Sequence, residues 1–259
     1  MAPLIHCVRH AQGFHNLGDE NWGMIDPLLT PAGESECREL RAAFPFHSSV
    51  QLVVASPLRR TIYTALHAFG PVFERNPDLK LIVLPDLQEV SDLPCDSGSD
   101  LNTMKKEVLE NNLPVDLSLV SDGWHVKSGR YAPGDYAIRM RARDARRWLQ
   151  ARPEREIVLV AHGGLLHFFT EDWEDGSLYA GTGWENVEYR TYGYKEEDGN
   201  NSTLIETDAS RQSRGKFGAR PTREQQGELY DLCRKQWDRD GVQLSAAERA
   251  AVSRASERI

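Results

Sequence analysis

The sequence predicts an α/β protein of three layers, in which helices cover both faces of a mostly parallel sheet. Along the first half of the chain, short apolar runs alternate with segments of helical periodicity, a pattern typical of βα units. The run at 157–160 contains only β-branched and aliphatic residues, as expected of a strand that is buried on both faces. A chain of 259 residues can enclose one large core of this kind.

Strands are predicted at 4–8, 51–55, 79–84 and 157–160. A helix should begin at Thr30-Pro31, because threonine caps free N–H groups and proline suits the first helical turn, and it should end near Phe44. Further helices are expected from Thr61 to Gly70 and over 135–151. Residues 187–194 and 203–207 predict a late hairpin around an Asp-Gly-Asn turn at 198–200.

Two segments stand apart from this alternation. Residues 91–134 show little regular pattern and predict a lid-like insertion over one end of the sheet. The polar tail at 211–259 predicts a helix over 220–237 and a second one over 244–259. Since no linker divides the chain, we expect a single domain over residues 1–259.

Composition excludes several classes of function. A net charge of −8 disfavours a nucleic-acid partner, and no apolar run reaches the roughly 18 residues of a membrane span. The first ten residues lack the pattern of a signal peptide, which predicts a cytoplasmic protein. The four cysteines form no CxxC pair, so they predict reduced thiols rather than a zinc or redox site.

Charged or histidine side chains follow four of the predicted strands: Arg9-His10, Arg60, Glu89 and His162. In open α/β sheets, ligand sites lie at the carboxyl ends of the strands, so these residues should converge on one pocket. Arginine suits the recognition of phosphate oxygens, and neutral imidazole is a competent nucleophile near pH 7. A nearby carboxyl group can supply and then remove a proton.

Three segments identify a family. Residues 9–16, RHAQGFHN, resemble the R-H-G-E/Q-x-x-x-N signature of the histidine phosphatase superfamily, which includes the phosphoglycerate mutases. Residues 56–65, SPLRRTIYTA, resemble its S-x-L-x-R-x-x-x-T-A signature, and residues 161–164 match A-H-G-G. Ala11 departs from the pattern by replacing a glycine, which should only constrain the backbone there. The resemblance covers roughly the first 170 residues, with all signatures in order.

The resemblance implies a role for each matching residue. His10 would become the phosphohistidine, while Arg9, Arg60 and His162 would bind the phosphoryl oxygens. Glu89 would act as the general acid and then as the base. Asn16 and Gly163 would add contacts to the phosphoryl group. No metal or cofactor is implied, because the two arginines supply the positive charge, and the partner would be a small phosphorylated substrate.

The run at 87–98 looks like that of the fungal and plant mutase-like phosphatases, which favours a phosphomonoesterase of histidine acid phosphatase type. A phosphoglycerate-type mutase, a non-catalytic phospho-ligand pocket and a repurposed site remain alternatives. Asp92 and Asp96 are rivals of Glu89 as proton donor.

Several other residues are interpreted as structural. His15 is expected to be a bystander, Trp22 a packing residue, and the arginines between 139 and 147 a solvated face. His125 is an alternative candidate for lining the substrate pocket. The sequence leaves the natural substrate and the oligomeric state open.

Overall fold

The computed structural model describes residues 2–176, 182–196 and 201–240. Within these ranges one mixed sheet runs through the molecule in the order β4-β3-β2-β5-β1-β6-β7. The first five strands of this order are parallel, and β6 and β7 are antiparallel to their neighbours. The strands are β1 Leu4–Arg9, β2 Leu52–Ala55, β3 Leu81–Val83, β4 Val115–Asp116, β5 Glu156–Ala161, β6 Tyr189–Tyr194 and β7 Leu204–Glu206.

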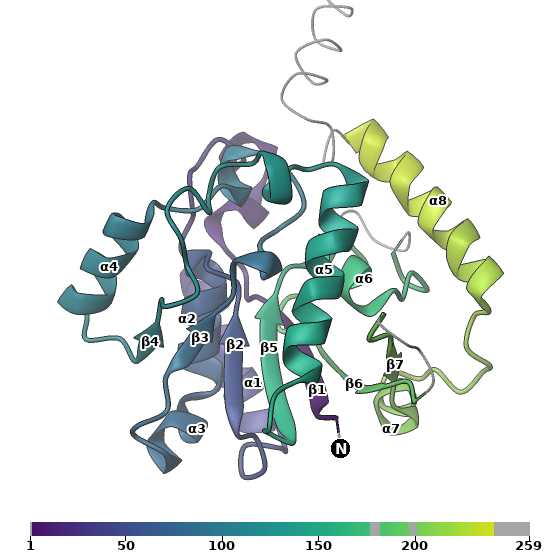
Figure 1. Ribbon diagram of the computed structural model, residues 1–259, viewed down its shortest axis with the longest axis horizontal. Coiled ribbons are helices and arrows are strands. Elements are labelled where there is room, and N and C mark those ends of the chain that lie inside the picture. The colour runs from purple at the N-terminus through teal and green to yellow at the C-terminus, as the bar shows by residue number, and fades with distance from the viewer. Residues whose placement is uncertain (1, 177–181, 197–200, 241–259) are drawn as a thin grey trace, which may run out of the picture.

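Helices cover both faces of this sheet (Figure 1), so the predicted three-layer architecture is confirmed. The α-helices are α1 Pro31–Ala43, α2 Arg59–Ala68, α3 Gly70–Arg75, α4 Leu101–Glu110, α5 Asp135–Gln150, α6 Gly163–Thr170, α7 Asp208–Ser213 and α8 Arg223–Asp240. The 3-10 helices are η1 Phe14–Leu17, η2 Asp19–Asn21, η3 Pro85–Leu87, η4 Pro94–Asp96 and η5 Gly129–Tyr131. None of the helices in the described ranges is long and apolar enough to cross a membrane.

Alternation along β5 explains why its sequence is apolar throughout. Ile157 and Leu159 belong to the core between the sheet and α5, α6 and α8, whereas Val158 and Val160 belong to the core between the sheet and α1 to α4. All four side chains are completely buried. A strand in the middle of a parallel sheet faces helices on both sides, so it carries no solvent-facing position.

Local capping fixes the start of α1 as predicted. The Thr30 hydroxyl accepts a hydrogen bond from the Gly33 N–H at 3.0 Å, and Pro31 occupies the first turn. Thr30 also donates to the Gln12 side chain at 2.7 Å. The cap therefore joins α1 to the loop that follows β1, which carries part of the candidate site.

The interpretation of residues 91–134 as irregular was incomplete. The segment contains α4, which is capped by the Asp100 carboxylate, and β4, which extends the sheet beside β3. The turn of the late hairpin at 198–200 and the second tail helix at 244–259 lie outside the described residues. The first tail helix is present as α8.

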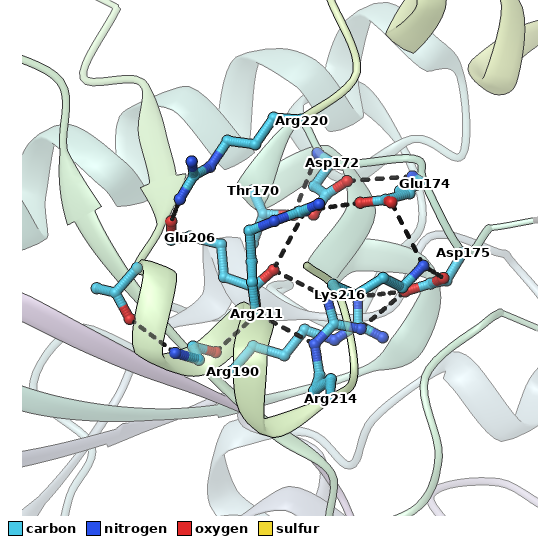
Figure 2. A network of polar contacts seen from close by, with 12 residues as sticks. Thr170, Asp172, Glu174, Asp175, Arg190, Glu206, Arg211, Arg214, Lys216 and Arg220 are labelled. Atoms are coloured by element: carbon cyan, nitrogen blue, oxygen red, sulfur yellow. Dashed lines mark hydrogen bonds and ion pairs between the residues drawn. The ribbon is translucent and has the colours of Figure 1, made fainter. Parts of the chain in front are cut away.

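A network of ion pairs joins the tail to the body of the domain. Figure 2 shows Arg190, Arg214 and Lys216 around the carboxylate of Asp175. Their nitrogen-to-oxygen distances to this carboxylate are 3.4, 2.8 and 2.6 Å. Burial raises the pKa of Asp175, but hydrogen bonds from Lys216 and Arg214 outweigh it and leave the pKa lowered. Asp175 thus links β6 with the segment that follows α7.

Candidate active site

A cavity of about 240 Å³ opens where the parallel strands end. It is lined by Arg9 and His10 after β1, by Arg60 at the start of α2, by Glu89 after β3, and by Gly163 after β5. The predicted convergence of these strand ends is therefore observed. A larger hollow of about 480 Å³ lies between α8 and the β6–β7 hairpin, but it contains none of these residues.

Hydrogen bonds define the tautomer of His10, which is 2% exposed. Its Nδ1 lies 2.7 Å from the carbonyl oxygen of Ala11, which can only accept, so Nδ1 carries the proton. Its Nε2 lies 3.2 Å from Nε of Arg60, which can only donate, so Nε2 presents its lone pair. The Ala11 N–H donates in turn to the Thr64 hydroxyl at 3.0 Å, and this bond fixes the residue whose carbonyl orients the ring.

The surroundings keep His10 neutral. Burial lowers its pKa well below the ordinary value, and the positive charge of Arg60 adds to this effect, followed by smaller contributions from His15 and Arg9. The hydrogen bond to the Ala11 carbonyl opposes the shift without cancelling it. The imidazole therefore keeps its Nε2 lone pair at neutral and mildly acidic pH.

Arg60 is anchored at the floor of the cavity and is completely buried. Its Nη1 donates to the Cys95 carbonyl at 2.6 Å, and its Nη2 donates to an Asp96 carboxylate oxygen at 2.8 Å. The other oxygen of Asp96 accepts from the Ser91 hydroxyl. Asp96 thus serves as the counter-ion of Arg60, and both of its oxygens are already engaged.

Nε of Arg9 and Nδ1 of His162 are buried and have no hydrogen-bond partner among the residues that the structure describes. Arg9 donates instead through Nη1 to the Trp184 carbonyl. His162 does not line the cavity: it lies behind His10, with ring centroids 5.2 Å apart, and its Nε2 is 2.8 Å from the Ser56 hydroxyl. Unpaired buried donors of this kind call for a ligand or water to satisfy them.

Asn16 and Gly163 both line the cavity, as predicted for contacts to the phosphoryl group. The Asn16 side-chain oxygen accepts from the Gly13 N–H at 3.0 Å, which closes the first turn of η1. Gly163 begins α6, and a Cβ atom there would lie 1.9 Å from the Thr182 hydroxyl. Only glycine permits this approach of Thr182 to the helix.

The Glu89 carboxyl group accepts three backbone N–H groups. Oε1 accepts from Val90 and Leu165, both at 2.9 Å, and Oε2 accepts from Gly164 at 3.2 Å. Gly164 allows this contact, because a Cβ atom there would lie 2.8 Å from Oε1. Burial raises the pKa of Glu89, and the negative charge of Asp96 raises it further, although the backbone hydrogen bonds act in the opposite direction.

Two cationic side chains hold the backbone of Glu89 in place. Lys127 and Arg141 donate to its carbonyl oxygen at 3.0 and 3.1 Å. Burial lowers the pKa of Lys127 to about 7. The prediction that the arginines of α5 form a solvated face is therefore wrong for Arg141 and also for Arg146, which are 1% and 2% exposed. Arg146 donates to the carbonyls at the end of α6.

Sequence reasoning missed several residues that line the cavity. His15 and Trp22 both line it, contrary to their expected roles, and Trp237 reaches it from α8. Of these three residues, only His15 could have been recognised from the sequence, because it lies within the first signature. Asp92 and His125 are not among the described residues that line the cavity.

Comparison with known proteins gives a consistent result. The family model of the histidine phosphatase superfamily (branch 1) matches residues 5–204. A phosphoglycerate mutase-like protein of Arabidopsis thaliana is 29% identical over 199 residues, covering 63% of this chain and 72% of the relative. A second, phosphoglycerate mutase-like protein 1, is 27% identical over 205 residues, covering 62% and 68%. Both agree with the predicted mutase-like branch.

Solved structures support the fold. Bacillus stearothermophilus YhfR superposes with a TM-score of 0.52 at 15% identity, covering 80% of this chain and 96% of that one. A putative α-ribazole-5'-P phosphatase from Escherichia coli K-12 superposes with a TM-score of 0.50 at 16% identity, with the same coverage. With the family model spanning most of the domain, the chain belongs to the histidine phosphatase superfamily (branch 1) and is an enzyme of phosphatase or mutase type.

Proposed function

We propose that the protein hydrolyses phosphomonoesters through a covalent phosphohistidine on Nε2 of His10, without requiring a metal ion. The observation that carries this proposal is the state of His10: a neutral ring with Nδ1 protonated and the Nε2 lone pair beside Arg60. A neutral imidazole is a nucleophile, whereas a protonated one is not. Because burial keeps the ring neutral at mildly acidic pH, we further propose activity of the acid phosphatase type.

In the first step, Nε2 of His10 attacks phosphorus, and the bond between phosphorus and the ester oxygen breaks. Arg9 and Arg60 would stabilise the negative charge of the transferring group. Nε of Arg9, which has no partner among the described residues, offers a further donor to the phosphoryl oxygens. Arg60 gives one N–H each to Cys95 and Asp96, and its Nε–H bond to His10 breaks when Nε2 attacks, so three of its five N–H donors can reach the substrate.

The leaving oxygen takes its proton from Glu89. Oε1 accepts two backbone N–H groups, while Oε2 accepts one at the longer distance of 3.2 Å, so Oε2 has the free lone pair for the proton. The raised pKa of Glu89 favours the protonated acid that this step needs. Asp96, the rival donor, is occupied by Arg60 and Ser91.

In the second step, the ionised Glu89 removes a proton from water, and the water oxygen attacks phosphorus. The bond between Nε2 of His10 and phosphorus breaks, the ring recovers its lone pair, and inorganic phosphate leaves. Glu89 ends the cycle protonated, ready for the next ester.

The first test is phosphate release from p-nitrophenyl phosphate between pH 5 and 8 in EDTA, with wild type and His10→Ala side by side. We expect release by the wild type alone, and a phosphoenzyme that is stable in alkali but lost in acid. Undiminished release by His10→Ala would overturn the mechanism. If the wild type releases no phosphate but isomerises phosphoglycerate when 2,3-bisphosphoglycerate is added, the protein is a mutase.

A further inference from the structure

Part of the lining of the catalytic cavity forms an aromatic and aliphatic wall. Trp22, Val90, Leu93 and Trp237 form this wall, and they come from three segments of the chain. The carbonyl oxygen of Trp22 accepts from the Cys95 N–H at 3.1 Å, so the loop carrying Trp22 is tied to the segment that anchors Arg60. This bond holds Trp22 in place beside the other apolar residues of the lining.

Trp237 closes this wall from outside the part of the chain that the family model matches. It is 1% exposed, and its ring contacts those of Trp173, Phe168 and His167 at centroid distances of 5.9, 6.3 and 6.4 Å. His167 in turn bonds through Nε2 to the carbonyl of Thr182, which itself lines the cavity. Helix α8 is thus continuous with the catalytic pocket.

The charges around the cavity disfavour a second anionic group on the substrate. Among the described residues that line it, the cationic ones are Arg9 and Arg60, both at the phosphoryl floor, whereas Asp19, Glu89 and Asp96 are acidic. His15 adds no charge, because burial and then Arg60 lower its pKa to about 2. A carboxylate or second phosphate on the substrate would find no cation of its own among these described residues, and an unpaired charge is costly in such a site.

The volume of the cavity suits one ring. A cavity of about 150 Å³ in another protein accommodates benzene. The 240 Å³ available here therefore leaves space for a phosphoryl group beside one ring of that size.

From the wall, the charges and the volume together, we propose that the substrate is a phosphomonoester whose organic part is uncharged and aromatic or similarly apolar, and that Trp237 of α8 and Trp22 determine this specificity. The inference rests on the proposed function and names the substrate class of the same site. It also makes α8 part of the catalytic domain.

The test compares two esters with the same primary alkoxide leaving group, 3-phenylpropyl phosphate and 4-phosphooxybutanoate. They differ only at the far end, so intrinsic reactivity cancels in the ratio of their kcat/KM values. We expect the wild type to prefer the phenyl ester by about tenfold or more, the effect of burying part of an aromatic ring. Trp237→Ala should lower kcat/KM for the phenyl ester about tenfold and change that of the carboxylate ester less than about threefold.

Two further variants separate a pocket effect from a loss of folding. Tyr230→Ala removes another ring of α8 that contacts Trp173, at 4.9 Å, but Tyr230 lines the separate hollow and should leave the preference unchanged. Trp22→Ala removes a partly exposed loop side chain, so it should reduce the preference without disturbing the core even if Trp237→Ala does not fold. Trp237→Phe should retain most of the preference.

The outcomes distinguish the two levels of inference. Equal turnover of both esters would overturn the substrate class, and a preference that survives both tryptophan substitutions would overturn the role of Trp237 and Trp22, while hydrolysis dependent on His10 still stands. If the wild type releases phosphate from neither ester nor from p-nitrophenyl phosphate, the proposed function itself fails, and the substrate class fails with it.

Discussion

Replacing Glu89 by glutamine tests the proposed proton donor, because the amide has almost the same shape but cannot give up a proton. Its single carbonyl oxygen can take the place of Oε1, which accepts the Val90 and Leu165 N–H groups. The amide nitrogen then faces the Gly164 N–H, which loses its acceptor. One unsatisfied buried donor costs about 1–3 kcal/mol of folding stability, so we expect the variant to fold.

The kinetic effect should depend on the leaving group. General acid catalysis contributes about 100- to 10,000-fold, or roughly 2.7–5.5 kcal/mol of activation free energy. An alkoxide needs the full contribution, whereas p-nitrophenolate leaves with little help. Glu89→Gln should therefore slow phosphoryl transfer from an alkyl phosphate by about 100-fold or more, and from p-nitrophenyl phosphate by less than about tenfold.

Single-turnover assays with enzyme in excess measure this step, because product release and dephosphorylation do not limit it. Arg9→Lys is the comparison variant: it keeps the positive charge but removes the Nε donor that would act on the phosphoryl group, so both substrates should slow equally. An equal loss for both substrates in Glu89→Gln would refute the assignment of Glu89 as the acid. Asp19, the remaining carboxylate of the cavity, would then be tested in the same way.

Three further predictions concern geometry, pH and stability. Gly164→Ala places a Cβ atom 2.8 Å from the Glu89 carboxylate and should displace this acid. We expect kcat for alkyl phosphates to fall by up to about 100-fold. An unchanged kcat would show that the exact position of the carboxyl group does not matter. The pKa of His10 is lowered and that of Glu89 is raised, so kcat/KM for alkyl esters should fall as the pH rises and Glu89 loses its proton. In Glu89→Gln this alkaline fall in kcat/KM should disappear. If the variant still shows the fall, Glu89 is not the group that titrates. Asp175→Asn should cost about 3 kcal/mol in urea unfolding at pH 7, since a buried ion pair loses one partner. The pKa of Asp175 is lowered in the folded protein, so its contribution to folding stability is present above the unfolded pKa and is lost as the pH falls. The difference in unfolding free energy between wild type and variant should therefore narrow below about pH 4. A difference that stays constant with pH would contradict the role of the Asp175 charge.

Local patterns in the sequence were sufficient for most of the elements and for the reactive centre. The cap at Thr30, the continuous apolar run of β5 and the three signatures depend on neighbouring residues and on spacing along one strand or helix, so they could be read directly. Helix α4 was missed although Asp100 and the helical spacing of Leu101, Met104 and Val108 predict it. Its surroundings, rich in loop-forming residues, hid the pattern.

Only the tertiary structure decided which polar groups share the site. Arg141 lies three residues after Ile138, on the buried face of α5, but a buried arginine is stable only where carbonyl groups from another segment receive it. Asp96 became the partner of Arg60 in the same way, through contact between distant loops.

The position of Trp237 shows the same division between sequence and structure. Periodicity predicts a helix in the tail, but it cannot tell which surface the helix covers. That choice depends on complementary side chains from α6 and its following segment, which meet the tail only after the sheet has brought them together. The sequence by itself therefore determined the fold class and predicted a candidate nucleophile, while the shape and charge of the cavity around that residue were decided by contacts between residues far apart in the chain.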